Sequence, residues 1–147
     1  MKTLKSKVLA GAAAVAASVG LTLATAPGAL AATGTSGWAS TGSSCSGSAI
    51  SSQYLAGGKF KYVLYYSSAN GGTNCLKLYN YTGQRTYMQV KLESSDYKAM
   101  AWDDGNYSQY AGAVRIHGVA GKCINQYVGV SWGGHFYTAD RYNVHCG

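Results

Sequence analysis

The C-terminal stretch YAGAVRIHGVAGKCINQYVGVSWGGHFYTADRYNVHCG, residues 110–147, carries the strongest fold signals in the chain. It contains alternating apolar residues at Val114 and Ile116, a turn at Gly121, and two cysteines, Cys123 and Cys146. Outside the cell, a disulfide between these cysteines would hold the last strands against the rest of a small domain. The stretch therefore predicts a small β domain that is stabilised by oxidised cysteines.

Residues 1–31 have the three parts of a secretory signal peptide. A lysine-rich start is followed by an alanine-rich apolar run over residues 8–26 and by a small-x-small cleavage site at Ala29-Leu30-Ala31. The run is also about long enough for a membrane anchor, but its weak hydrophobicity and the cleavage site favour removal. We therefore expect a secreted protein that begins near Ala32, has about 116 residues and is not held in a membrane after cleavage.

An even number of cysteines in a short exported chain predicts two disulfides. The four cysteines are Cys45, Cys75, Cys123 and Cys146. Three pairings are possible, and we favour the sequential one, in which Cys45 pairs with Cys75 and Cys123 with Cys146, because each bond would then join neighbouring strands. A metal site is the alternative, but the chain has no C-x-x-C pair and its three histidines are irregularly spaced, so we expect no metal and no cofactor.

Alternating aromatic and β-branched residues predict a series of short strands. The clearest is residues 59–66, in which Phe60, Tyr62 and Leu64 share one face. Further strands are expected over residues 74–81, 86–93, 97–102, 110–118, 123–130 and 136–146, with a turn at Asp103-Asp104-Gly105-Asn106. The fold class is therefore all-β, a small antiparallel sandwich or barrel of six to seven strands with two disulfides.

The segment before the first cysteine differs in composition from the rest. Residues 32–44 are rich in glycine, serine and threonine, which predicts a flexible arm. Residues 45–147 are then expected to form a single disulfide-bonded domain.

Charge limits the possible partners. Without the three lysines of the signal peptide, the chain keeps nine basic and five acidic residues, a net charge of +4. The basic residues are dispersed rather than clustered, so we expect no nucleic-acid partner. A mildly basic exported protein suits an anionic cell wall or polysaccharide, although the charges also serve simply to keep the protein soluble.

Three residue patterns suggest catalysis, and none satisfies the chemistry that it suggests. Gly129-Val130-Ser131-Trp132-Gly133 matches the G-x-S-x-G motif of hydrolases, but that motif needs a strand-to-helix turn on a large parallel sheet. The scattered histidines do not have zinc-ligand spacing. Asp103 and Asp104 are neighbours, whereas paired catalytic carboxylates must face each other. We therefore predict no catalytic residues and no enzymatic activity.

Tyrosines form the one constellation with a binding interpretation. All 13 lie after the signal peptide. The candidate surface consists of Tyr65, Tyr79, Tyr81, Tyr87, Tyr97, Tyr127 and Trp132. Such rings, with lysine and arginine nearby, can stack on sugars or dock a partner. The alternative is cross-strand packing, which stabilises a sheet by about 0.2–1 kcal/mol per pair.

The last third of the chain carries a family resemblance. Tyr110-Ala111-Gly112-Ala113-Val114, Ala120-Gly121-Lys122-Cys123 and the terminal His145-Cys146-Gly147 resemble the spore-associated protein A family of filamentous actinobacteria. The segments Val63-Leu64-Tyr65-Tyr66 and Gly72-Thr73-Asn74-Cys75 are similar to the strand-turn-Asn-Cys element of that family. The resemblance implies a small exported protein found with spores or aerial cell surfaces, without known enzymatic activity.

Together these patterns predict a secreted, non-enzymatic protein at the spore or cell-wall surface. It would adhere to a surface polymer through basic and tyrosine-rich patches. One alternative is an inhibitor of an extracellular protease that presents residues 126–137 as a rigid loop, since preorganised loops bind at lower entropic cost. A carbohydrate-binding module is the other.

Overall fold

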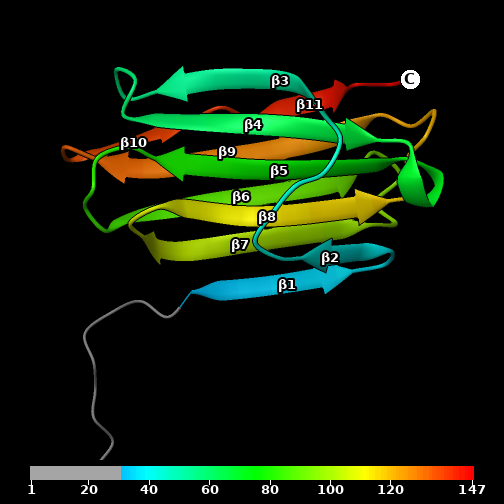
Figure 1. The fold of residues 1–147 in the computed structure, drawn as a ribbon, viewed down its shortest axis with the longest axis horizontal. Helices are drawn as coiled ribbons and strands as arrows, with labels where there is room; N and C mark the ends of the chain where they lie inside the picture. The colour runs from blue at the N-terminus through cyan, green and yellow to red at the C-terminus, as the bar shows by residue number, and fades with distance from the viewer. Residues whose placement is uncertain (1–30) are drawn as a thin grey trace, which may run out of the picture.

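The computed structural model describes residues 31–147, so the expected signal peptide lies outside the described residues except for Ala31. The described chain forms eleven strands in two antiparallel sheets (Figure 1). The expected antiparallel sandwich is therefore confirmed, with more strands than the sequence predicted. The expected pairing is confirmed as well, because disulfides join Cys45 to Cys75 and Cys123 to Cys146.

Sheet A is built around the central pair β6 and β9. Its order is β1 (Ala32–Ser36), β7 (Met100–Tyr107), β6 (Thr86–Ser94), β9 (Ile124–Trp132) and β10 (His135–Thr138), and β11 (Arg141–Val144) also pairs with β9. β10 pairs with the C-terminal half of β9 and β11 with its N-terminal half, so both lie at the same edge of the sheet.

Sheet B has the order β2 (Ala39–Thr41), β8 (Tyr110–His117), β5 (Thr73–Asn80), β4 (Phe60–Ser67) and β3 (Ser48–Leu55). A single 3₁₀ turn, η1 (Ala69–Gly71), lies in the connection between β4 and β5, where Asn70 takes the left-handed conformation (φ 55°). Because β2 and β3 occupy opposite edges, residues 42–47 must cross the outer face of the three strands between them (Figure 1). We call this crossing segment the strap.

The core lies between the two sheets and follows the alternation in the sequence. Inward-facing residues from both sheets are fully buried: Phe60, Tyr62, Leu64, Leu76, Leu78, Met88, Leu92, Val114 and Ile116. The strands expected at residues 59–66, 74–81, 86–93 and 110–118 thus present the faces that the sequence predicted.

The expected arm, residues 32–44, contains two strands instead. β1 pairs with β7 over Ala32–Ser36, and β2 pairs with β8 over Ala39–Thr41. Backbone hydrogen bonds at two sheet edges therefore order a segment whose side chains show no apolar alternation. Together β1 and β2 add a strand to each sheet.

The expected turn at residues 103–106 was also wrong. These residues continue β7, and the real turn lies at Ser108 and Gln109. The Asp103 carboxylate points into the sandwich, where it accepts hydrogen bonds from the Tyr107 hydroxyl and from the Gly112 amide at 2.6 Å. A buried carboxylate with two donors supports a strand at a sequence that is otherwise typical of a turn.

Candidate binding surface

The structure divides the predicted aromatic surface between the two sheets. Tyr65 and Tyr79 lie on the outer face of sheet B, with Tyr81 just after β5. Tyr87 and Tyr127 lie on the outer face of sheet A. Tyr97 is in the connection between β6 and β7, and Trp132 ends β9 and packs edge-on against Phe60. The predicted residues therefore form no single patch.

Strand register brings one row of rings and one cation together across sheet B. Tyr54, Lys61, Tyr79 and Tyr110 are successive cross-strand partners on β3, β4, β5 and β8. The Lys61 ammonium lies 5.0 Å from the centre of the Tyr54 ring. The adjacent row supplies Lys77, whose ammonium lies 3.7 Å from the Tyr110 ring centre and 5.3 Å from that of Tyr79. The ammonium groups of Lys61 and Lys77 therefore attract the faces of the neighbouring tyrosine rings.

Two more tyrosines, Tyr65 on β4 and Tyr81 just after β5, lie next to this row of side chains. The Tyr65 and Tyr79 hydroxyls are hydrogen-bonded at 3.3 Å, and the Tyr79 and Tyr81 rings are parallel with centres 6.5 Å apart. Burial, with the Tyr65 hydrogen bond, raises the pKa of Tyr79 to about 12. The Tyr79 hydroxyl therefore stays protonated and remains a hydrogen-bond donor. We call Tyr54, Lys61, Tyr65, Lys77, Tyr79, Tyr81, Tyr110 and Arg115 together the basic face.

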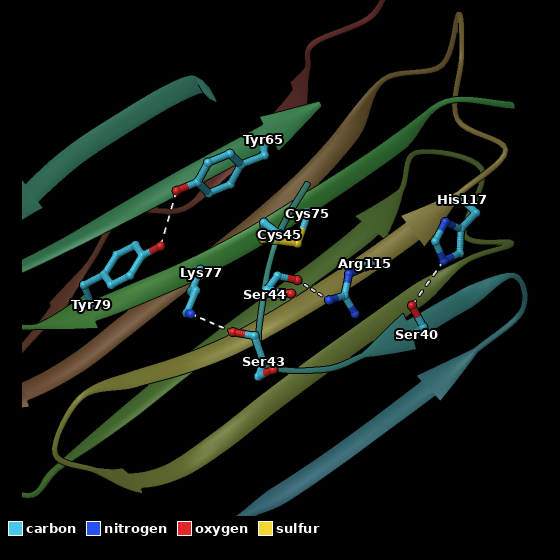
Figure 2. Close-up of a disulfide and its surroundings, with 10 residues drawn as sticks. All are labelled: Ser40, Ser43, Ser44, Cys45, Tyr65, Cys75, Lys77, Tyr79, Arg115 and His117. Atoms are coloured by element: carbon cyan, nitrogen blue, oxygen red, sulfur yellow. Dashed lines mark hydrogen bonds between the residues drawn. A yellow bond between two sulfur atoms is a disulfide. The ribbon is translucent and has the colours of Figure 1, made fainter. Parts of the chain in front are cut away.

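The strap crosses the basic face and is fastened at several points. The Cys45–Cys75 disulfide anchors it to β5, and backbone hydrogen bonds join Gly42 and Ala113 in both directions. Lys77 donates to the Ser43 carbonyl at 2.7 Å, and Arg115 donates to the Ser44 carbonyl (Figure 2). Two of the cations are thus held in fixed positions beside the strap.

A small polar cluster lies on the far side of the strap from Tyr65 and Tyr79 (Figure 2). The His117 ring is hydrogen-bonded to Ser40 at 3.1 Å and to Thr73 at 2.9 Å. Burial and the nearby Arg115 lower the pKa of His117, so its neutral form is favoured. With two hydroxyl partners and a neutral ring, His117 stabilises the local structure at the end of sheet B.

The basic face carries cations, and the strands that form it carry no acidic residue. All five acidic residues lie between Glu93 and Asp140 in the sequence, and the five strands of sheet B, as the structure describes them, contain none. Sequence reasoning missed this separation because it counted charges over the whole chain. The signal was nevertheless present, since no acidic residue precedes position 93.

The patterns considered for catalysis and for loop presentation occupy regular structure. Ser131 lies near the end of β9, and the residues that flank it form a hairpin with β10 instead of a strand-to-helix turn. Asp140 accepts a hydrogen bond from the Val128 amide at 3.1 Å. Residues 126–137, expected to form a rigid loop, are therefore mostly paired strand, and Gln126 is fully buried.

Within residues 31–147, no group of three or more histidine, cysteine or acidic side chains is placed to hold a metal ion. The same residues contain no helix of the length and apolarity needed to cross a membrane.

Comparison with known proteins gives the family. The chain is 32% identical over 127 residues to spore-associated protein A of Streptomyces coelicolor, a match that covers 85% of this chain and 78% of that protein. The chain belongs to the spore-associated protein A family. No protein-family model matches the chain, and no solved structure matches it.

Proposed function

We propose that this member of the spore-associated protein A family is a secreted, non-enzymatic protein of the spore or cell surface. It adheres through the basic face to an anionic surface polymer. The name of the Streptomyces coelicolor relative supports the association with spores, and two disulfides suit an extracellular protein. The observation that carries the adhesive role is the basic face itself, in which cations and tyrosine rings cover a sheet without acidic residues.

The geometry explains how such a face would bind. Polymer phosphates or carboxylates would meet the Lys61 and Arg115 charges, while exposed rings such as Tyr54 and Tyr81 would pack against the polymer backbone. Each contact is weak, but many contacts along one polymer act together. Fixed side chains also lose little conformational freedom on binding, which favours adhesion by a rigid face.

Sedimentation with purified spore walls and with isolated anionic wall polymer tests the proposal. The variant Lys61→Glu places a negative charge in the central row of the basic face. Lys98→Glu is the matched control, because it makes the same charge change at an exposed position near Asp96, on the connection between β6 and β7. We expect retention at low salt that falls in about 0.5 M NaCl, where screening is strong, and that falls much further for Lys61→Glu than for Lys98→Glu.

Two results would contradict this proposal. One is the absence of retention on either material at low ionic strength. The other is an equal loss for the two variants, which would indicate attraction by net charge alone and no role for the basic face.

A further inference from the structure

The outer face of sheet A carries a groove that the proposed function does not use. The groove has a volume of about 350 Å³ and is lined by Tyr87, Gln89, Lys91, Trp102, Asp104 and Tyr127. This volume lies within the range of about 300–1,000 Å³ that is typical of small-molecule sites. We call it the sheet A groove.

Strand register builds the groove from two rows with different chemistry. Trp102 on β7, Lys91 on β6 and Tyr127 on β9 are cross-strand partners, with the Lys91 ammonium 4.8 Å from the Tyr127 ring centre. The next row contains Asp104 and Gln89, which are partners on β7 and β6. The rings of Trp102 and Tyr127 therefore lie in the row next to the hydrogen-bonding side chains of Asp104 and Gln89.

Two strand glycines make room for these side chains. A Cβ atom at Gly34 would lie 2.0 Å from the Trp102 ring, so that ring rests directly on the β1 backbone. A Cβ atom at Gly129 would lie 2.8 Å from the Gln89 amide nitrogen. Glycine weakens a strand interior and often marks a close approach. Here it lets Trp102 and Gln89 lie against the sheet, so the groove is formed before any ligand binds.

The charges of the groove differ from those of the basic face. Lys91 pairs with Glu93 at 3.4 Å, and Glu93 also accepts a hydrogen bond from the Tyr127 hydroxyl at 3.1 Å. Asp104 adds a second carboxylate, and among the described residues its carboxylate takes part in one hydrogen bond, a long one of 3.4 Å from Tyr87. With Lys91 as its one cation and Glu93 and Asp104 as two carboxylates, the groove does not attract a polyanion. The half-exposed Asp104 carboxylate can, however, accept further hydrogen bonds.

We propose that the sheet A groove binds an uncharged polysaccharide. A pyranose ring has an apolar face of C–H groups, which would pack on Trp102 and Tyr127. Its hydroxyls would donate to the Asp104 carboxylate and would exchange hydrogen bonds with the Gln89 amide. The ligand is hydroxyl-rich and neutral because the groove supplies acceptors and rings but no excess of positive charge.

Isothermal titration calorimetry with cellulose and chitin hexasaccharides tests this inference, with polygalacturonate as the anionic probe. We expect at least one hexasaccharide to bind, and Trp102→Ala to weaken its binding by about tenfold or more, since aromatic anchors dominate binding energy. Asp104→Asn keeps the shape of the side chain but removes its charge, and should weaken binding without loss of the fold. Melting temperatures of both variants verify that they are folded.

The basic-face variant Lys61→Glu separates this inference from the proposed function. It should leave hexasaccharide affinity unchanged, because Lys61 lies on the other sheet. The inference is overturned if neither hexasaccharide binds, or if folded Trp102→Ala and Asp104→Asn proteins bind as well as the parent. It is also overturned if polygalacturonate binds in a Trp102-dependent manner, or if size-exclusion chromatography shows a dimer that Trp102→Ala converts to a monomer, since a second copy of the chain would then cover the groove.

Discussion

Replacement of Cys45 and Cys75 together by alanine removes the covalent link between the strap and β5 without creating a free thiol. The cysteines are 30 residues apart in sequence, so their bond closes a large loop in the unfolded chain. In the chain-entropy treatment, a loop of this length restricts the unfolded state by about 3.7 kcal/mol. We therefore expect the double variant to lose about 3–4 kcal/mol of unfolding free energy.

The same loss can be expressed as a change in melting temperature. A domain of about 116 residues unfolds with an entropy of about 0.24 kcal/mol/K. The expected decrease in melting temperature is therefore about 15 °C. The corresponding loss of about 3–4 kcal/mol in unfolding free energy is a large share of the roughly 5–15 kcal/mol that stabilises a domain of this size.

The assay combines urea unfolding with amide hydrogen exchange. Lys77 and Arg115 contact strap carbonyls independently of the disulfide, so we expect the strap of the variant to loosen rather than leave the sheet. Faster exchange is expected at the amides of Gly42 and Ala113, which are hydrogen-bonded between the strap and β8. The control is the double variant Cys123→Ala with Cys146→Ala, which opens a loop of similar size at the other end of the chain.

The reasoning fails if the Cys45/Cys75 variant loses less than about 1 kcal/mol, well below the usual range for a native disulfide. It also fails if the control variant accelerates exchange at Gly42 and Ala113 to the same extent. That outcome would mean that the Cys45–Cys75 bond has no specific role in holding the strap.

Two further predictions concern acidic residues. Asp103→Asn should cost about 1–3 kcal/mol of unfolding free energy, because the amide cannot accept from both the Tyr107 hydroxyl and the Gly112 amide; the half-exposed neighbour Asp104→Asn should change it by less than about 0.5 kcal/mol, and equal effects in urea unfolding would contradict the buried role. The Ser94 hydroxyl and the Lys122 ammonium hold the pKa of Asp96 well below its usual value of 3.8. Ionised Asp96 therefore stabilises the fold above that value, and this stabilisation is lost as the pH falls below it. Thermal unfolding between pH 5 and pH 2 should show a smaller decline for Asp96→Asn than for the parent, and parallel curves would refute this.

Local sequence patterns predicted much of the fold because strand periodicity is a local property. The alternation of Phe60, Tyr62 and Leu64 identified the buried face of β4, and the cysteine count together with the expected export predicted the two disulfides. Segments whose structure depends on distant partners were not predictable in this way. β1 and β2 form because their backbones pair with the edges of β7 and β8. No apolar pattern in the sequence predicts such pairing.

The candidate surface shows the same limit more clearly. Tyr79 and Tyr87 were grouped in one candidate surface, but the sequence could not show that β5 and β6 belong to different sheets. Sheet order is decided by packing across the sandwich and by the crossing connections, which act between residues far apart in sequence. The sequence predicted only a strand over residues 97–102, and the place of Trp102 became clear from the register that sets it beside Gly34 and Lys91.

The strap also constrains the order of assembly of the molecule. Its ends pair at opposite edges of sheet B, and its middle rests on strands that come from residues 60–117. Residues 42–47, although they precede these strands in the sequence, therefore have no surface to cross until β4, β5 and β8 have come together. Cys45 can therefore reach its native place beside Cys75 only when β5 already lies in the sheet on which the strap rests.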